Sequence, residues 1–247
     1  LPEAFKNGYT FNGWKDSNGN NVTSSTVVKG ELELTADYTL TEYNITYDLD
    51  HGSADTKNKY TIEDEFDLVT PTRKGYTFAG WTGTGIDGCQ TRVTIYHETG
   101  DKDFTAHWSK NENTKYYVNH KYENLDGTYE TVREELSGPT DEEVTAPLKE
   151  KYGFDNPRTK SLVISGDEDS EVTYIYTRHE YSLTLNDDIE TTFTNPTYPY
   201  QTEITLTAKD NDFYQFTGWS NGKTTKTITF PIVEDTNIYP IYDYNGY

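Results

Sequence analysis

The sequence contains no methionine and only one cysteine, Cys89, in 247 residues. A single cysteine excludes an intrachain disulfide, so small modules in this chain must depend on packing for their stability. Positive charge is also scarce, because 21 Lys and Arg residues stand against 42 Asp and Glu residues, a formal net charge of −21. A surface this acidic repels phosphate groups, which argues against nucleic acid and anionic membrane surfaces as partners.

Long apolar segments are missing as well. No run of 18 apolar residues occurs, so we expect no membrane insertion. No signal peptide is visible in the opening residues LPEAFKNGYTF, and we expect a piece of a longer protein. Hydrophobic residues make up 32% of the chain. That fraction is low for one large core and favours several thin cores.

Tyrosine is abundant, at 22 residues, and alternating polar and apolar runs recur. Tyr and Thr favour half-buried pleated surfaces, so these runs predict strands. Clear examples are EVTYIYT (171–177), YSLTL (181–185), EITLTA (203–208) and TKTITF (225–230). Helical periodicity is confined to PTDEEVTAPLKEKYG (139–153), where Pro147 interrupts it. The chain is predicted to be mainly β.

A repeated motif organises the chain. GYTFNGW (8–14) recurs as GYTFAGW (75–81) and, degraded, as YQFTGW (214–219). The three tryptophans lie 67 and 138 residues apart, close to one and two units of equal length. This signature predicts four modules, named here in chain order: module 1 (1–42, partial), module 2 (43–110), module 3 (111–178) and module 4 (179–247).

The signature strand must place two aromatic residues in one core. In YTFAGW, strand alternation puts Tyr76 and Phe78 on one face and Trp81 on the other. A bulge at Gly80 would shift this alternation and bring Trp81 to the side of Phe78. We therefore predict a set of aromatic core anchors: Phe11, Trp14, Phe78, Trp81, Phe216 and Trp219.

Module 3 lacks the signature. It contains NLDG (124–127) between alternating runs, which predicts a β-hairpin because Asp and Gly tolerate a positive φ.

These residues resemble known repeat families. The stretch from Pro71 to Trp108, with GYTFAGW and DFTAHW, is similar to the Listeria–Bacteroides repeat, the B-repeat of internalin-type surface proteins, as is GYTFNGWKDSNGN in module 1. Module 4 resembles a divergent relative through FTGWSNG (216–222) and TNIYPIY (236–242). Module 3 resembles a mucin-binding-protein (MucBP-like) repeat through NHKYENLDGTY and VTYIYTR.

The resemblance implies small β-grasp-like modules strung along Gram-positive surface proteins, where they act as stalks, spacers or adhesive elements. The fold prediction is therefore mainly β, with tandem small β-grasp-like modules in an elongated arrangement. Short linkers at 109–113 and 177–180 leave little slack between modules.

Candidate chemistry is sparse. Residues Gly83–Gly88 spell G-x-G-x-x-G, but a strand-like run follows instead of a helix, so we predict a glycine-rich turn and not a nucleotide site. Cys89 precedes Gln90; adjacent residues do not readily close a thioester ring, so a free thiol is predicted. Three acidic clusters, 165–171, 185–190 and 208–213, lack the spacing of a calcium loop and are predicted to be solvated turns.

The five histidines are scattered singly, at His51, His97, His107, His120 and His179. No zinc-binding or nucleophile motif occurs, so we predict no enzyme and assign no catalytic, cofactor-binding or metal-binding residue. Ligand-binding residues stay unknown. The candidates are Tyr198 and Tyr200 in NPTYPYQTE, which could stack on a sugar or contact a protein, or simply pack on a thin sheet.

We expect a non-enzymatic stalk or adhesion segment of a large extracellular protein at the cell surface or cell wall, monomeric within a longer chain. One alternative is a glycan- or mucin-binding module, with host or bacterial surface glycans or proteins as partners. Another is an accessory region of a secreted hydrolase. How module 1 completes its sheet without a first strand is left open, and its edge is a possible pairing site.

Overall fold

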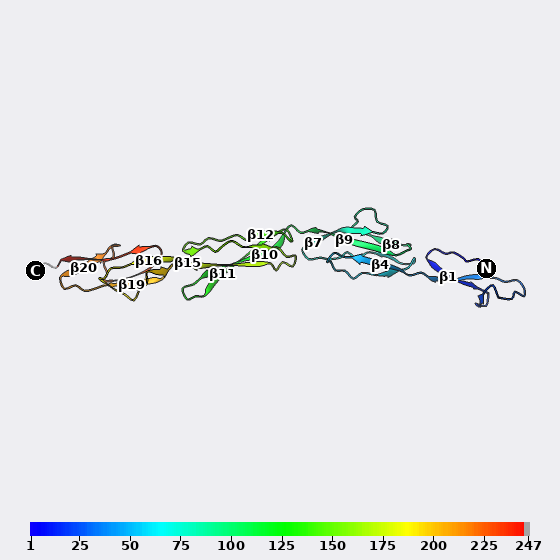
Figure 1. Cartoon of the computed structure of the whole chain (residues 1–247), viewed down its shortest axis with the longest axis horizontal. Helices are drawn as coiled ribbons and strands as arrows, with labels where there is room; N and C mark the ends of the chain where they lie inside the picture. The colour runs from blue at the N-terminus through cyan, green and yellow to red at the C-terminus, as the bar shows by residue number, and fades with distance from the viewer. Residues whose placement is uncertain (245–247) are drawn as a thin grey trace. The chain divides into compact units, whose positions relative to one another are not determined.

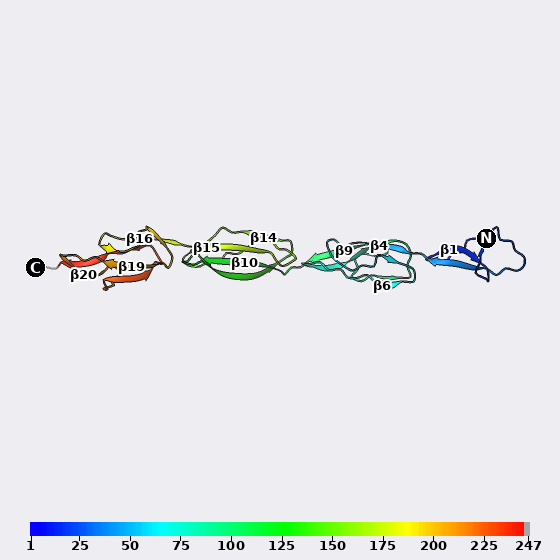
Figure 2. The same ribbon diagram turned by 90° about the horizontal axis from the view of Figure 1, so that it is seen from below.

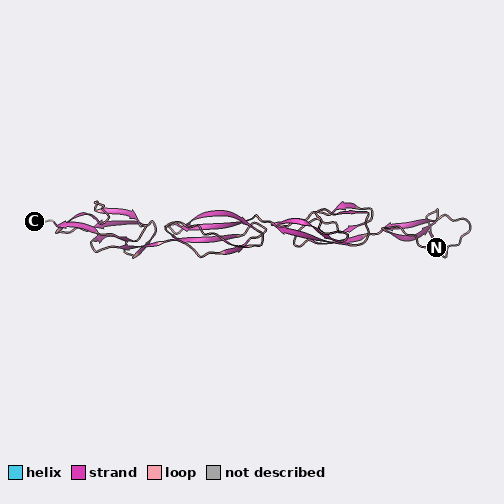
Figure 3. Cartoon of the chain, turned by 90° about the horizontal axis from the view of Figure 1, so that it is seen from above, coloured by secondary structure: helices cyan, strands magenta, loops and turns pink. Residues whose placement is uncertain are grey.

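A computed structural model describes residues 1–244, and all regular structure in that range is β-strand (Figure 3). None of the described residues lies in a helix that is long and apolar enough to cross a membrane. The chain divides into two compact units. The first comprises Leu1–Thr114 and Pro139–Asp141, and the second comprises Lys115–Gly138 and Glu142–Tyr247. The mainly β prediction is confirmed.

Within the first unit, module 2 has a complete set of strands in two sheets, of which module 1 has only a part (Figure 1). Its main sheet has the order β5-β4-β9-β7, with β4 parallel to β9 and β7 antiparallel to β9. A second sheet pairs β6 with β8, and a buried core contains residues from both sheets. Its strands are β4 (Tyr43–Asp48), β5 (Lys59–Tyr60), β6 (Glu65–Asp67), β7 (Tyr76–Gly83), β8 (Thr94–Tyr96) and β9 (Lys102–Lys110).

Module 1 contains only the part of this arrangement that surrounds the signature strand. Its sheet has the order β2-β1-β3 and consists of β1 (Tyr9–Lys15), β2 (Asn21–Val22) and β3 (Thr35–Leu40). Strand β1 corresponds to β7 and β3 to β9, because Trp14 pairs with Ala36 as Trp81 pairs with Ala106. Among the described residues, no strand pairs with β3 in the place that β4 takes beside β9.

Module 3 has the same strand topology as module 2 although it lacks the signature. Its main sheet contains the parallel strands β10 and β15 (Figure 2) and has the order β11-β10-β15-β13. A second sheet pairs β12 with β14. Tyr116, Val118, Tyr174 and Tyr176 are buried in its core. Its strands are β10 (Thr114–Glu123), β11 (Tyr129–Gly138), β12 (Glu143–Thr145), β13 (Phe154–Asp155), β14 (Ser161–Val163) and β15 (Glu171–Arg178).

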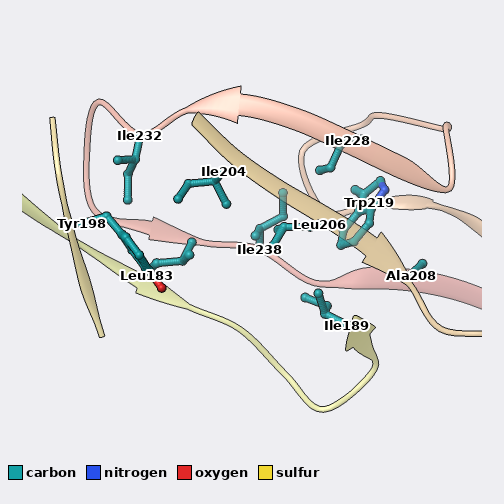
Figure 4. Close-up of a cluster of buried hydrophobic side chains, with 10 residues drawn as sticks. All are labelled: Leu183, Ile189, Tyr198, Ile204, Leu206, Ala208, Trp219, Ile228, Ile232 and Ile238. Carbon is teal, nitrogen blue, oxygen red and sulfur yellow. The ribbon is translucent and has the colours of Figure 1, made fainter. Parts of the chain in front are cut away.

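Module 4 divides its strands among three small sheets, ordered β18-β16-β22, β17-β19-β21 and β20-β23. Figure 4 shows Trp219 beside Leu206 and Ile228 in the core that these sheets enclose. Its strands are β16 (Glu180–Thr184), β17 (Ile189–Glu190), β18 (Thr197–Pro199), β19 (Glu203–Ala208), β20 (Tyr214–Trp219), β21 (Thr227–Pro231), β22 (Thr236–Asn237) and β23 (Pro240–Tyr244).

The predicted bulge is present in the signature strand. The register between β7 and β9 shifts between Phe78 and Gly80, and Gly80 has φ +144°. Phe78 and Trp81 then lie on the same side, with ring centroids 5.3 Å apart in an edge-to-face arrangement. Register shifts also follow Phe11 in β1 and Phe216 in β20. The bulge therefore belongs to the signature in all three copies.

The predicted aromatic anchors differ in depth. Trp81 and Trp219 have essentially no exposed surface, and Phe78 and Phe216 pack against their cores from the side. Trp14 and Phe11 are only half-buried. The anchor prediction is thus confirmed in modules 2 and 4 and holds in part for module 1.

Two local predictions concern module 3. The NLDG hairpin is confirmed, because Asn124 N donates to Thr128 O at 2.8 Å and Gly127 has φ +81° between β10 and β11. The weak helical periodicity at 139–153 does not produce a helix, and this stretch contains β12 instead. Val144 of β12 packs against the module 3 core, so tertiary packing overrides the local pattern.

Candidate functional site

The G-x-G-x-x-G segment forms a turn, as predicted. Strand β7 runs into Gly83, Ile86 N donates to Gly83 O at 3.2 Å, and Gly85 and Gly88 have positive φ values. The next strand is β8, so no helix N-terminus faces the loop. The glycines serve the chain reversal between two strands.

Cys89 lies at the end of that turn with its side chain exposed. Its Sγ donates to Ala79 O at 3.7 Å, whereas the Gln90 side-chain amide donates to Asp87 O at 3.2 Å. The backbone of Gln90 exchanges two hydrogen bonds with Trp81, so this residue extends the pairing beside β7. Cys89 is therefore a free cysteine, as predicted.

The second and third acidic clusters lie side by side, because Lys209 N donates to Asp188 O at 2.9 Å where β17 pairs with β19. No group of three or more His, Cys, Asp or Glu residues that could hold a metal ion occurs between residues 1 and 244. In the last cluster, Lys226 forms an ion pair with Asp210. In the second, Lys209 Nζ donates to Asp187 O at 2.6 Å. These neighbouring lysines offset part of the local charge.

The histidines lie apart, and His120 has a structural role that the sequence analysis missed. His120 is fully buried in module 3, where Nδ1 lies 2.9 Å from Tyr176 Oη and Nε2 lies 3.3 Å from Glu134 Oε2. Burial raises the pKa of Tyr176. Alternation along β10 could have identified this position, because His120 shares a face with Tyr116, Val118 and Tyr122.

The candidate ligand-binding tyrosines are both engaged within the second unit. Tyr198 is buried in the module 4 core, and its hydroxyl accepts a hydrogen bond from Asn195 N at 2.8 Å. Tyr200 is half-buried and packs edge-to-face on Tyr152, with centroids 5.6 Å apart. The sequence left open whether Tyr198 contacts a ligand or packs on a thin sheet, and the structure shows that it packs in the core.

Tyr198 occupies the same place in module 4 as Tyr60 occupies in module 2. Tyr60 pairs with Tyr43 of β4, and Tyr198 pairs with Tyr181 of β16. Burial raises the pKa of Tyr60 to about 12, and the nearby Glu98 adds to the effect. The sequence carried a signal for this match, since Phe66 follows Tyr60, and Ile204 follows Tyr198, at the same spacing of six positions.

The described residues therefore define a chain of small all-β modules with repeated topology, each complete module having its own core. Residues 1–37 and 43–107 match the family model of the Listeria-Bacteroides repeat domain, and residues 181–245 match that of the divergent InlB B-repeat domain. These internalin-type repeats imply a bacterial surface or extracellular protein.

Internalin H of Listeria monocytogenes is 30% identical over 113 residues, which is 44% of this chain and 20% of that protein. The Bacillus anthracis TIE protein is a solved structure with a TM-score of 0.32 and 13% identity, covering 95% of this chain and 65% of that one. That TM-score is too low to indicate a shared fold.

Proposed function

We propose that this chain is a non-enzymatic stalk segment of a bacterial surface protein, located at the cell surface or cell wall, in which four small modules space a distal region from the cell. The internalin-type repeat matches support the setting. The observation that carries the spacing role is the length of the connections between modules.

Those connections are very short. Two residues separate β3 from β4, three separate β9 from β10, and one separates β15 from β16. A linker of one to three residues has almost no freedom to fold back, whereas long Gly- or Ser-rich linkers behave as flexible coils. Each complete module also has its own core. This combination suits a series of domains that keeps its ends apart.

A surface-display experiment tests the spacing role. The chain is placed between a cell-wall anchor and a terminal epitope, and antibody binding to intact cells is compared with an anchor–epitope fusion that lacks the chain. The stalk function predicts strong antibody binding only with the chain present. Equal binding by the two fusions would contradict it.

Recognition of surface glycans is a second function, favoured by the similarity of NHKYENLDGTY in module 3 to MucBP-like repeats and by exposed tyrosines. Tyr198 and Tyr200 are engaged in packing, so exposed residues such as Tyr96 and Tyr129 would have to carry the contact. A glycan array separates the functions. Selective binding that is lost in Tyr129→Ser or Tyr96→Ser would favour recognition, and no selective binding would favour the stalk.

A further inference from the structure

A glycine in the left-handed conformation stands directly before β1 in module 1 and directly before β13 in module 3, the strand that takes the place of β7 there. Gly8 precedes β1 with φ +76°, and Gly153 precedes β13 with φ +81°. Both glycines are buried, although the residues just before them are exposed. A positive φ favours glycine, but the burial requires a second explanation.

The second explanation is a side chain from the following module. A Cβ atom added to Gly8 would lie 2.5 Å from Ile62 Cβ, and one added to Gly153 would lie 2.3 Å from Tyr200 Cδ1. Ile62 and Tyr200 occupy corresponding turns, shortly before β6 and β19. Interiors pack too tightly to accept such overlaps without rearrangement. Because glycine has no Cβ atom, there is space for the side chain of Ile62 or Tyr200 from the next module to pack against it.

Backbone hydrogen bonds continue through the linker at the same place. His179 N donates to Gly153 O at 2.9 Å, and His179 O accepts from Tyr200 N at 2.8 Å, so one residue joins the pairing of module 3 to that of module 4. Thr41 N likewise donates to Gly8 O at 3.0 Å. The linkers are thus held by ordered hydrogen bonds.

The pair of hydrogen bonds at His179 occurs a second time, inside the first unit. Asn111 N donates to Gly75 O at 2.9 Å, and Asn111 O accepts from Thr140 N at 3.0 Å. Gly75 also has a positive φ, +74°. The bond from the linker N–H to the glycine carbonyl is thus made three times, to Gly8, Gly75 and Gly153, and each of these glycines has a positive φ. The glycine is therefore the common element.

Side chains add to the contact between modules 3 and 4. Arg178 Nη1 donates to Tyr200 O at 2.6 Å, and Tyr152 Oη donates to Val233 O at 3.0 Å. Between modules 1 and 2, Tyr9 Oη donates to Glu63. These bonds join residues that are far apart in sequence, so they restrain one module against the next.

We propose that the glycine directly before β1 in module 1 and before β13 in module 3 is the docking site for the following module of the same chain. Contact between this glycine and the turn residue fixes module 2 on module 1 and module 4 on module 3. In module 4 the corresponding residue is Phe213, which is 69% exposed, so that module lacks the docking glycine. The proposal does not depend on a stalk function, because it is argued only from contacts between neighbouring modules.

The test compares two alanine variants of the full chain. Gly153→Ala places a methyl group against Tyr200, whereas Gly127→Ala has the same φ of +81° at a position with no atom within 4 Å. Amide residual dipolar couplings are measured in a weakly aligned sample. We expect modules 3 and 4 to share one alignment in the wild type and in Gly127→Ala, and to lose it in Gly153→Ala.

The outcomes are separable from general unfolding. A shared alignment that persists in Gly153→Ala would overturn the proposal, as would an equal loss in Gly127→Ala, which would assign the effect to backbone strain. If Gly153→Ala unfolds module 3, Tyr200→Ala decides instead, since it removes the docked ring and leaves the glycine intact. Retained alignment in Tyr200→Ala would then overturn docking, and its loss would support it. Gly8→Ala and Gly19→Ala form the matched pair for modules 1 and 2, because Gly19 has φ +82° and open space.

Discussion

Modules 1 and 2 carry nearly the same signature strand but bury it to different depths. Trp81 in YTFAGW has no exposed surface, whereas Trp14 in YTFNGW is half-buried. The Trp81 ring contacts Tyr47, Phe78 and Phe104, with centroids 5.3–6.5 Å apart. Trp14 has one such contact among the described rings, to Phe11.

The difference follows from the strand beside β9. Tyr47 belongs to β4, which pairs in parallel with β9, and no described strand of module 1 takes that place beside β3. The signature and its bulge therefore direct the tryptophan to one face, and the added parallel strand supplies the surface that buries it. Burial depth is a property of the whole sheet.

The largest effect is expected from Trp81→Ala. Removing a large buried aromatic residue costs about 3–5 kcal/mol, which is most of the stability of a domain of this size. Module 2 should unfold, observed as loss of its dispersed amide NMR signals while modules 3 and 4 keep theirs. Trp14→Ala is the matched control and should cost much less. A Trp81→Ala chain that melts like the wild type would refute the anchor role.

The next effect concerns high pH and Tyr60, which has no counterpart in the described strands of module 1. Its pKa is about 12 in the folded state because of burial, against an ordinary value of 10, and its hydroxyl donates to Gly100 O at 2.6 Å. The unfolded chain therefore ionises first. The contribution of Tyr60 to stability is complete below pH 10 and is lost between pH 10 and 12, at about 1.4 kcal/mol per pH unit.

Tyr60→Phe isolates this contribution. The variant should lose less unfolding free energy than the wild type between pH 10 and 11.5, measured by denaturant titration of module 2. Other tyrosines affect both proteins alike, so the difference between the two slopes reports Tyr60. Identical slopes would show that ionisation of Tyr60 is not coupled to folding.

A smaller effect is expected when the two bulge glycines, Gly80 and Gly13, are each replaced by alanine and the losses of stability are compared. Gly80 and Gly13 have φ values of +144° and +132°, so alanine strains the backbone at both, by about 1–3 kcal/mol. At Gly80 the new Cβ would also lie 2.6 Å from Cys89 Sγ and 3.0 Å from the Gln90 carbonyl carbon, whereas at Gly13 it meets nothing within 4 Å.

We expect Gly80→Ala to destabilise its module by at least about 1 kcal/mol more than Gly13→Ala, because an overpacked site adds its own cost. Thermal unfolding of the full chain, followed by amide signals of each module, measures both variants. Equal losses would show that backbone strain alone decides the cost of the bulge.

Local patterns were sufficient to predict the strands β15, β16, β19 and β21, the hairpin at NLDG, the turn at Gly83–Gly88 and the bulge at Gly80, since each depends on residues close in sequence. The parallel pairing of β4 with β9 joins residues 57 positions apart, as in Ile45 and Lys102, and no local pattern encodes it. The module boundaries and the β-grasp likeness stay predictions.

The candidate site was less predictable. Tyr198 looked like a loop residue because Pro196 and Pro199 flank it, yet its pairing with β16 buries it. Gly8 opens the signature and Gly153 stands beside a strand, but neither local pattern reveals a docking contact, because the contacts involve residues 54 and 47 positions away. Such contacts become visible only in three dimensions.

Small-angle X-ray scattering of the full chain tests the stalk account most directly. The longest strands have nine and ten residues, so a module is about 30 Å long at roughly 3.3 Å per residue, and four in line give a radius of gyration of about 35 Å. A compact 247-residue domain would have about 18 Å. The stalk account predicts a radius of gyration near the value for four modules in line, and a radius near the value for a compact domain would contradict it.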